Sequence, residues 1–429
     1  MSNSIINFVI LFNDLSMKTK IINDPVHGFI KINNPLILDL IDHPYFQRLK
    51  RIKQLGLSEF VYPGAHHTRF HHALGAYFLM TKALNNLRLK GFEISENELE
   101  SAQIAILLHD IGHGPFSHVL EFSLLKDIHH EDISSILMER LNEFFNGKLS
   151  LAINMFKDEY PRRFFHQLIS SQLDVDRLDY LSRDSFYTGV KEGFIGAERL
   201  LEMISLKNDE LVLEIKGIYS IENFLMARRL MYWQVYLHKT SIASESMLIQ
   251  LINRAKDLNK NGHHLEIVKP FEIFLTKEIG KNEFESNNEI IDFFTDLDDH
   301  SIWGSINNWK YSSDKILRNL SKQFLNRELP KCLLESQKLN ENFIIEQKSL
   351  VQNKWGLTNE EVNYFINEGN NSNSAYVSTT ESIKIINKKG EVIDLLEASD
   401  LPTIHALSQV VKKYYFCYPK DIYLQNKLT

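Results

Sequence analysis

The feature that most constrains this chain is a His-Asp pair at the predicted end of a helix, His109-Asp110, followed by a Gly-His-Gly turn at residues 112–114. One nitrogen and one oxygen ligand are too few to hold a metal, but the chain supplies His72 upstream and Asp176 downstream. Two imidazoles and two carboxylates suit Mg, Mn, Fe, Zn or Ni, and they leave coordination positions for water and phosphate oxygen. The sequence therefore predicts one divalent ion per active site, held by His72, His109, Asp110 and Asp176.

The composition is typical of a globular protein. A chain of 429 residues, 44% hydrophobic and 24% charged, is long enough for a large domain with an appended subdomain. The net charge of -7 argues against broad coating of nucleic acid, although local contact with nucleic acid stays open. Because Cys332 and Cys417 are the only cysteines, we expect a reducing, cytoplasmic setting and no disulfide framework. The apolar run at residues 5–12 is too short to span a membrane, so no membrane partner is expected.

Capping and breaker residues predict a mainly α fold. Asn34-Pro35 opens one helix, a second runs from Asp42 to Gly56, and a capping box at residues 95–98 opens the helix that ends at Asp110. Further helices are expected over residues 71–91, 174–184, 220–257 and, as short pieces, 270–330. Alternation predicts hairpins over 206–215 and 383–395 and a strand over 329–334, whereas the Asn/Ser-rich residues 369–374 indicate a mobile loop.

Three regions follow from this pattern. Because Met17 is a second candidate start, we interpret residues 1–16 as an N-terminal extension that need not be ordered. Residues 17–260 form the predicted helical core. Residues 261–429 form a mixed helical and α+β region that we expect to serve oligomerisation.

Four titratable side chains follow the His-Asp pair within a short stretch: His113, His118, Glu121 and His130. Hydrolysis of a phosphoester needs an acid for the leaving group, and a carboxylate raises the pKa of a neighbouring His toward the working pH. His118 and Glu121 lie three residues apart, so they face each other if the segment is helical. His129 precedes His130, which leaves open which of the two histidines enters the site.

Cationic side chains provide candidate phosphate ligands: Arg69, Arg177, Arg228 and Lys239. An Arg fork grips phosphate at two points. Helical spacing places Arg228, Tyr232, Tyr236 and Lys239 along one predicted wall, and it places Asp176, Tyr180 and Asp184 on one face. The basic stretch 42–56 fits a surface helix, a nucleic-acid contact or a nucleotide contact.

Five segments together resemble the deoxynucleoside triphosphate triphosphohydrolases of the HD phosphohydrolase superfamily, which include a SAM-and-HD-domain enzyme and bacterial dGTPase-like proteins. The segments are residues 23–28, 46–49 with 53–56, 62–65 with 69–72, 109–118, and 174–184. The resemblance covers residues 20–335, and we expect no SAM domain. It implies an α-helical HD core that splits a dNTP, with dGTP among the expected substrates, into deoxynucleoside and inorganic triphosphate.

The resemblance also implies roles for individual residues. His118, helped by Glu121, would protonate the departing 5′ oxygen while water attacks the α-phosphorus, and His113 and His130 would steady phosphate oxygens. The triphosphate would be held by Arg69, Arg177 and Arg228, where Arg177 replaces a Lys of the eukaryotic enzyme. Tyr180 and Asp184 would contact the sugar. A wall that leaves no room for a ribose 2′-hydroxyl would consist of Gln54, Leu55 and Tyr236.

In the family, regulatory nucleotides bind at subunit interfaces of a dimer or tetramer. Asp42, Gln47, Arg327 and Lys331 match positions that recognise a guanine nucleotide, which implies a homo-oligomer with GTP or dGTP as activator. Lys50 stands where the family has Arg, and a Lys lacks the planar fork that this contact uses.

Two other functions fit the same residues. An HD phosphodiesterase or nucleotidase acting on a signalling nucleotide would use His113, with His129 or His130, to hold a second metal, so metal content per chain separates it from the first reading. A non-catalytic nucleotide or single-strand nucleic-acid binder would survive replacement of Asp110 by Ala, whereas an enzyme would not. The preferred base and the native metal stay open.

Overall fold

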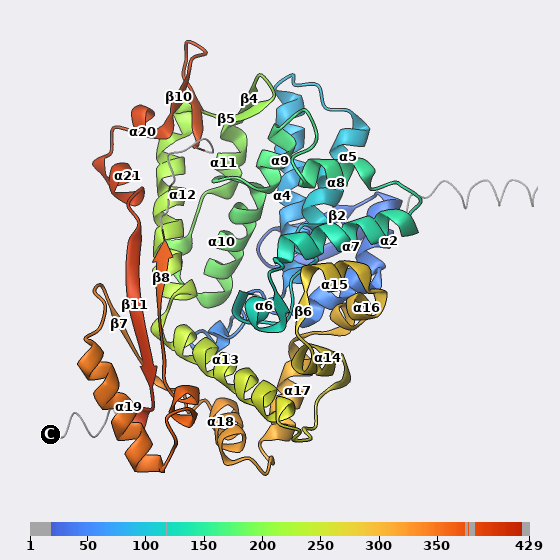
Figure 1. The fold of residues 1–429 in the computed structure, drawn as a ribbon. Coiled ribbons are helices and arrows are strands. Elements are labelled where there is room, and N and C mark those ends of the chain that lie inside the picture. The colour runs from blue at the N-terminus through green and yellow to red at the C-terminus, as the bar shows by residue number, and fades with distance from the viewer. Residues whose placement is uncertain (1–18, 117, 374–375, 377–381, 423–429) are drawn as a thin grey trace, which may run out of the picture.

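The computed structural model describes residues 19–116, 118–373, 376 and 382–422, and this part of the chain is mainly α, as predicted (Figure 1). The predicted N-terminal extension, residues 1–16, lies outside the described residues. The main hydrophobic core includes Ile30 near one end of the chain and Leu407 near the other. The core thus contains residues from both sides of position 260, and the division there stays a prediction. None of the described helices combines the length and hydropathy that a bilayer crossing requires.

Three packed helices carry the centre of the molecule: α4 (Arg69–Leu89), α5 (Glu96–Leu108) and α10 (Val175–Thr188). The predicted capping box begins α5, because the Ser95 hydroxyl accepts from Glu98 N while the Glu98 carboxylate accepts from Ser95 N. Helix α5 ends at Leu108, so His109 is its C-cap residue. The His-Asp pair therefore lies at a helix C-terminus that points into the core, as predicted.

Further helices surround these three or form the C-terminal half. In the first part of the chain they are α2 (Pro35–Asp42), α3 (Pro44–Gln47), α6 (His118–Leu124), α7 (His130–Phe144), α8 (Ser150–Phe156), α9 (Phe164–Ile169), α11 (Ala197–Met203), α12 (Ile218–Met231) and α13 (Lys239–Lys260). The short helices predicted over residues 270–330 are α14 (Lys269–Thr276), α15 (Lys281–Ser286), α16 (Asn288–Asp296), α17 (Asp299–Trp309) and α18 (Lys315–Leu325). After them come α19 (Glu341–Trp355), α20 (Leu395–Ala398) and α21 (Pro402–Leu407).

The strands form small sheets. An antiparallel hairpin joins β1 (Lys20–Asp24) to β2 (Gly28–Ile32), and a short parallel pair joins β3 (Leu125–Lys126) to β6 (Ile279–Gly280). Both predicted hairpins are present, β4 (Ile204–Lys207) with β5 (Glu210–Glu214) and β9 (Lys384–Ile386) with β10 (Val392–Asp394), and they join in one sheet. The predicted strand near residue 330 is β7 (Lys331–Glu335). It pairs with β11 (Val411–Tyr418), which also pairs with β8 (Asn367–Asn373), along one side of the molecule (Figure 1).

The predicted helix from Asp42 to Gly56 is wrong. Only α3 and a 3-10 turn over Arg48–Arg51 form, and the chain then becomes extended at Ile52. The tertiary structure competes for this segment: the buried Arg48 guanidinium donates to the Ile111 and Leu297 carbonyls, and Lys53 N donates to Asp299. These contacts place Gln54 and Leu55 in an irregular segment.

The predicted continuous helix over residues 220–257 is also wrong. Helix α12 ends at Met231, a π-helical turn spans Tyr232–Tyr236, and His238 caps α13 by accepting from Thr240 N. Lys239 therefore begins a new helix, within electrostatic reach of Cys332. Lys239 is thus separated from Arg228 by the break, so no single helix carries the four predicted wall residues, whereas the Tyr232 and Tyr236 rings stay 5.2 Å apart.

Residues 369–373 are part of strand β8, so the predicted mobile loop is wrong there, while Ser374 lies outside the described residues. The whole of β8, from Asn367 to Asn373, pairs with β11. Asparagine and glycine disfavour strands, but the β-favouring run 411–418 supplies a partner of matching length. The long-range partner, and not local propensity, determines the structure of this segment.

Candidate metal centre and nucleotide site

The four predicted ligands lie close together, although they come from three different parts of the chain. His72 lies on α4, His109 and Asp110 follow α5, and Asp176 lies on α10. The Asp176 Oδ1 atom is 3.0 Å from His72 Nε2 and 3.4 Å from His109 Nε2. The Asp110 carboxylate is 3.7 Å from His72 Nε2 and 3.4 Å from His109 Nε2. Ligand atoms of His72, His109 and Asp176 thus lie within 4.8 Å of one another, and the Asp110 carboxylate adjoins this group.

The unpartnered atoms of this cluster fit a divalent cation. Among the described residues, the buried Nε2 atoms of His72 and His109 have no hydrogen-bond partner. The other ring nitrogen of His109, Nδ1, donates to the Ile106 carbonyl at 2.7 Å, which leaves the Nε2 lone pair facing the carboxylates. Two imidazole lone pairs and two carboxylates form a mixed N/O donor set that divalent first-row metals and Mg²⁺ accept.

The electrostatics of the cluster also favour a cation. Burial lowers the pKa of His72, but the neighbouring carboxylates of Asp176 and Asp179 outweigh burial and raise that pKa to about 10. Burial raises the pKa of Asp110, but His109 and Arg69 outweigh it and hold the Asp110 pKa well below its ordinary value. The carboxylates are thus ionised, and they stabilise positive charge at the position that a metal would take.

His113 and His130 form the second layer of the site. His113 Nε2 lies 3.3 Å from Asp110 Oδ1, and the His113 ring stacks on His130 with centroids 3.8 Å apart. His130 Nδ1 donates to Glu121 Oε1 at 2.9 Å, whereas the His129 side chain is 59% exposed. Of the two neighbouring histidines, His130 is therefore the one that enters the site.

His118 is the first residue of α6, but its side chain lies outside the part of the chain that the structure describes. The predicted pairing of His118 with Glu121 is thus not tested. Glu121 Oε1 accepts from both the backbone N and the Nδ1 atom of His130, a contact that sequence spacing alone did not indicate.

Three of the predicted phosphate ligands have described contacts at or near the cluster, and Lys239 instead lies near Cys332. Arg69 donates to Asp110, and Arg177 donates to Asp174, so both guanidinium groups are held in place by buried carboxylates. Arg228 lies within electrostatic reach of Tyr180. Their contact with triphosphate stays a prediction.

A polar and aromatic wall extends from the metal centre. The Tyr180 ring is 6.4 Å from the His72 ring and 6.1 Å from the Tyr236 ring. The Tyr236 hydroxyl donates to Asp184 Oδ2 at 2.8 Å, and His67 Nε2 donates to Asp184 Oδ1 at 2.7 Å. Tyr180, Asp184 and Tyr236 therefore form one connected surface, as the predicted sugar contacts require.

Gln54 and Leu55 adjoin this wall through His67. Gln54 N donates to the His67 carbonyl at 3.0 Å, and Leu55 is half-buried. The buried Gln54 Oε1 has no hydrogen-bond partner among the described residues. Exclusion of a 2′-hydroxyl by these residues stays a prediction.

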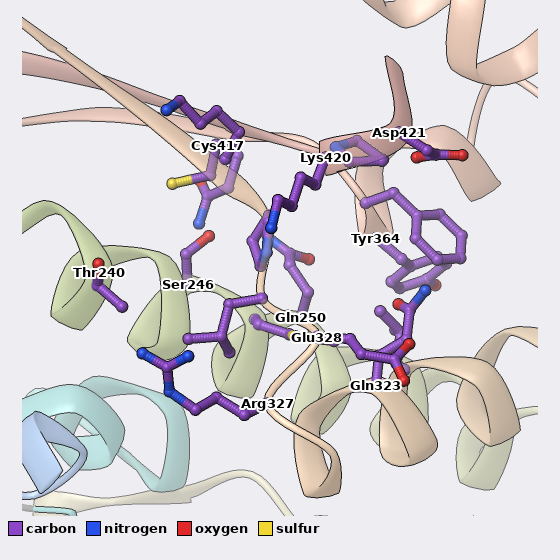
Figure 2. A pocket seen from close by; sticks show the side chains of 18 of the residues that line it. Thr240, Ser246, Gln250, Gln323, Arg327, Glu328, Tyr364, Cys417, Lys420 and Asp421 are labelled. Carbon is purple, nitrogen blue, oxygen red and sulfur yellow. The ribbon is translucent and has the colours of Figure 1, made fainter. Parts of the chain in front are cut away.

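The predicted regulatory residues lie in two places. Asp42 pairs with Lys20 at 3.0 Å, and Lys50 donates to Gln47 at 2.7 Å, all near α2 and α3. Arg327 and Lys331 instead line a cavity of about 670 Å³ between α13, α18 and the β7–β11 pair. Figure 2 shows Arg327 and Lys420 on opposite sides of this cavity. A guanine nucleotide at an interface of two chains stays a prediction.

Sequence reasoning missed several residues that support the site: His27, His67, Asp174, Asp179 and Arg183. Asp179 lies three residues after Asp176 on α10, and His27 lies within the segment 23–28 that carries the family resemblance. These positions in the sequence were the signals that could have indicated a role. The contacts themselves, such as His27 with Asp179 and His67 with Asp184, join residues more than a hundred positions apart.

Comparison with known proteins agrees with this geometry. Residues 69–184 match the model of the HD domain, and residues 195–269 match that of the HD associated region. The Bacillus subtilis protein YwfO is 33% identical over 72% of this chain and 71% of its own. The crystal structure of a phosphohydrolase from Bacteroides thetaiotaomicron is 52% identical, with a TM-score of 0.90, and covers 94% of this chain and 100% of that chain. The chain belongs to the HD-domain phosphohydrolases.

Within this family, the chain is homologous to the SAMHD1 deoxynucleoside triphosphate triphosphohydrolases. The Dictyostelium discoideum SAMHD1 homologue is 32% identical over 59% of this chain. The chain spans about half of that protein, 52% of its length. The HD phosphohydrolase assignment thus accounts for the metal cluster, which lies within the matched region.

Proposed function

We propose that this HD phosphohydrolase is a metal-dependent dNTP triphosphohydrolase that converts a dNTP and water into deoxynucleoside and inorganic triphosphate, with dGTP among its substrates. One observation carries the proposal: a single helix, α10, bears the metal ligand Asp176, then Tyr180, then Asp184, and Tyr236 closes on Asp184. This order suits a 5′-nucleotide whose α-phosphate lies at the cluster and whose sugar lies one helical turn or two away. The SAMHD1 relatives carry the same activity in their names.

The residues divide the chemistry between them. His72, His109, Asp110 and Asp176 would hold the ion, which when bound would polarise a phosphate oxygen and favour ionisation of water. Arg69, Arg177 and Arg228 would neutralise the triphosphate. His130, with Glu121 on its Nδ1 atom, is placed to steady a phosphate oxygen beside His113. His118 would protonate the 5′ oxygen as it leaves the α-phosphorus.

We further propose a homo-oligomer in which GTP or dGTP activates the enzyme through Asp42, Gln47, Lys50, Arg327 and Lys331. The support is that these polar residues lie away from the metal cluster, at the ends of different elements. Size measurement with and without GTP tests this step, and activation should disappear in the double variant Arg327→Ala, Lys331→Ala.

The experiment that tests the proposed reaction is incubation of the pure protein with each dNTP, alone and with GTP or dGTP, in Mn²⁺ or Mg²⁺, followed by chromatography of the products. Deoxynucleoside and triphosphate are expected, and both should vanish in Asp110→Ala. Absence of turnover in every mixture would refute the proposed substrate.

One observation favours a second candidate, a phosphodiesterase or nucleotidase for a signalling nucleotide. Asp110, His113 and His130 form another group whose potential ligand atoms lie within 4.8 Å of one another. A second ion there would share Asp110 with the first. Two ions per chain by elemental analysis, together with cleavage of a cyclic or dinucleotide phosphodiester, would favour this candidate.

A further inference from the structure

The turn between β1 and β2 carries part of the family resemblance but has no role in the proposed reaction. Asp24 Oδ1 accepts from Val26 N at 3.0 Å and from His27 N at 2.9 Å. Gly28 completes the turn with a φ of +76°, which favours glycine. The turn is therefore rigid, and it directs the other Asp24 oxygen and the His27 ring toward the core.

The side chains of Asp24 and His27 both contact a buried ion pair, that of Asp179 with Arg183. His27 Nε2 donates to Asp179 Oδ1 at 2.6 Å, and Arg183 donates to both Asp179 oxygens at 2.9 Å. Arg183 also donates to Asp24 Oδ2 at 2.7 Å. The side chains of Asp179 and Arg183 are fully buried. A buried carboxylate costs free energy unless it is paired, and this one has three donor residues when His72 is included.

The last donor to Asp179 is the metal ligand His72, whose Nδ1 atom lies 2.8 Å from Asp179 Oδ2. The same carboxylate also accepts from His27 and Arg183, so both of its oxygens serve as acceptors. An ionised carboxylate only accepts hydrogen bonds, so His72 carries its proton on Nδ1. Nε2, the ring nitrogen that remains for a metal, then faces Asp110 and Asp176.

The packing of α4 on α10 is built around this network. A Cβ atom on Gly75 would lie 1.9 Å from Asp179 Oδ1 and 2.2 Å from Arg183 Nη2. The glycine thus allows the close approach that brings His72 to Asp179. The other imidazole ligand, His109, is oriented by a neutral carbonyl of its own helix, so the two ligands are held in different ways.

We propose that Asp179 is a positioning residue that fixes the tautomer and ring orientation of His72, and that His27, Arg183 and Asp24 hold Asp179 in place, so that the β1–β2 turn sets the affinity of the metal centre. Outer partners of this kind tune metal affinity in proteins by about 10- to 100-fold. The inference rests on the metal centre of the proposed function and is independent of the substrate.

The test is the affinity and spectrum of Co²⁺ in the variant Asp179→Asn. The dissociation constant is measured by competition with a chelator, and the visible absorption of bound Co²⁺ reports ligand geometry. Asp179→Asn is expected to bind Co²⁺ about 10- to 100-fold more weakly, with a changed spectrum. The matched control is Asp314→Asn, which removes a carboxylate that also pairs with an arginine, Arg254, on α13. That control should keep the wild-type affinity and spectrum.

His27→Phe provides a second variant, because it keeps a ring and removes only the donor to Asp179. Loss of one hydrogen bond to a charged group predicts about tenfold weaker Co²⁺ binding in protein whose circular dichroism is unchanged. Wild-type affinity and spectrum in a folded Asp179→Asn or His27→Phe variant would overturn the inference. If the variants differ from the wild type in this way, but the wild type leaves every dNTP intact, the proposed substrate is wrong and this inference stands.

Discussion

Two regions of the molecule bury a carboxylate in opposite ways. In the catalytic core, Asp179 is surrounded by three donors and keeps its charge. On α13, beside the C-terminal sheet, Glu245 is half-buried, and no hydrogen bond or ion pair to it is present among the described residues. Burial alone raises the pKa of Glu245 to about 8. The same physical cost is thus met by pairing in one region and by protonation in the other.

The two regions also differ in how firmly their polar side chains are held in one orientation. Around the metal centre, a hydrogen bond holds the Nδ1 nitrogen of each histidine ligand. Asp179 accepts from His72, and the Ile106 carbonyl accepts from His109. At the cavity of Figure 2, the exposed Arg327 donates to the Phe60 carbonyl, and Lys420 has no hydrogen bond or ion pair within the described part of the chain. The metal centre is therefore the more pre-oriented of the two regions.

The largest expected effect comes from the core. Asp176→Asn removes a carboxylate that both imidazole ligands face, so we expect dNTP hydrolysis to fall about a thousandfold or more, since metal-assisted charge stabilisation contributes several kcal/mol. Rates and metal content measured together check this outcome. Asp314→Asn, which removes a paired carboxylate far from the site in sequence, should retain activity. Equal losses of activity in both variants would contradict a specific role of Asp176 in the metal centre.

Metal removal should affect the core next most strongly. An ion present at about 100 times its dissociation constant stabilises the native state by roughly 2.7 kcal/mol, because it binds the folded chain and not the unfolded one. Differential scanning calorimetry with and without a chelator should show a lower Tm after chelation. The Asp176→Asn variant should show no such shift, and an identical shift in that variant would place the ion elsewhere.

A smaller effect is expected at Glu245. The folded-state pKa of about 8 lies above the ordinary value, so the folded state binds a proton that the unfolded state has released. The contribution of Glu245 to stability is therefore present at low pH and is lost as pH rises from about 4.5 to about 8. Glu245→Gln should be more stable than wild type by up to about 4 kcal/mol at pH 8, and equal to it near pH 4, in urea unfolding. An advantage that does not grow with pH would contradict protonation at this site.

The smallest effect separates two properties of Tyr236. Tyr236→Phe removes the hydrogen bond to Asp184 and keeps the ring, so kcat/KM for a dNTP should fall about tenfold while rejection of the matching NTP persists. Tyr236→Ala should weaken that rejection as well, because the wall loses its ring. Measured dNTP-to-NTP ratios of kcat/KM decide between the two properties, and an unchanged ratio in Tyr236→Ala would remove this residue from the wall.

Local signals in the sequence predicted much of the helical core and the convergence of His72, His109, Asp110 and Asp176. Capping residues, glycine and the adjacent His-Asp pair act over a few residues, so one chain reveals them. The break at His238 and the strand β8 depend on distant partners, and local patterns favoured a helix and a loop instead. Asp179 was missed for the same reason, since its partner His27 is 152 positions away.

The measurement that tests the central claim most directly is hydrolysis of a dNTP in H₂¹⁸O with the metal-loaded wild-type protein, followed by mass spectrometry of both products. Attack of water on the α-phosphorus breaks the bond to the 5′ oxygen, so the account predicts one ¹⁸O atom in inorganic triphosphate and none in the deoxynucleoside. Deoxynucleoside monophosphate with pyrophosphate, or label in the deoxynucleoside, would contradict it.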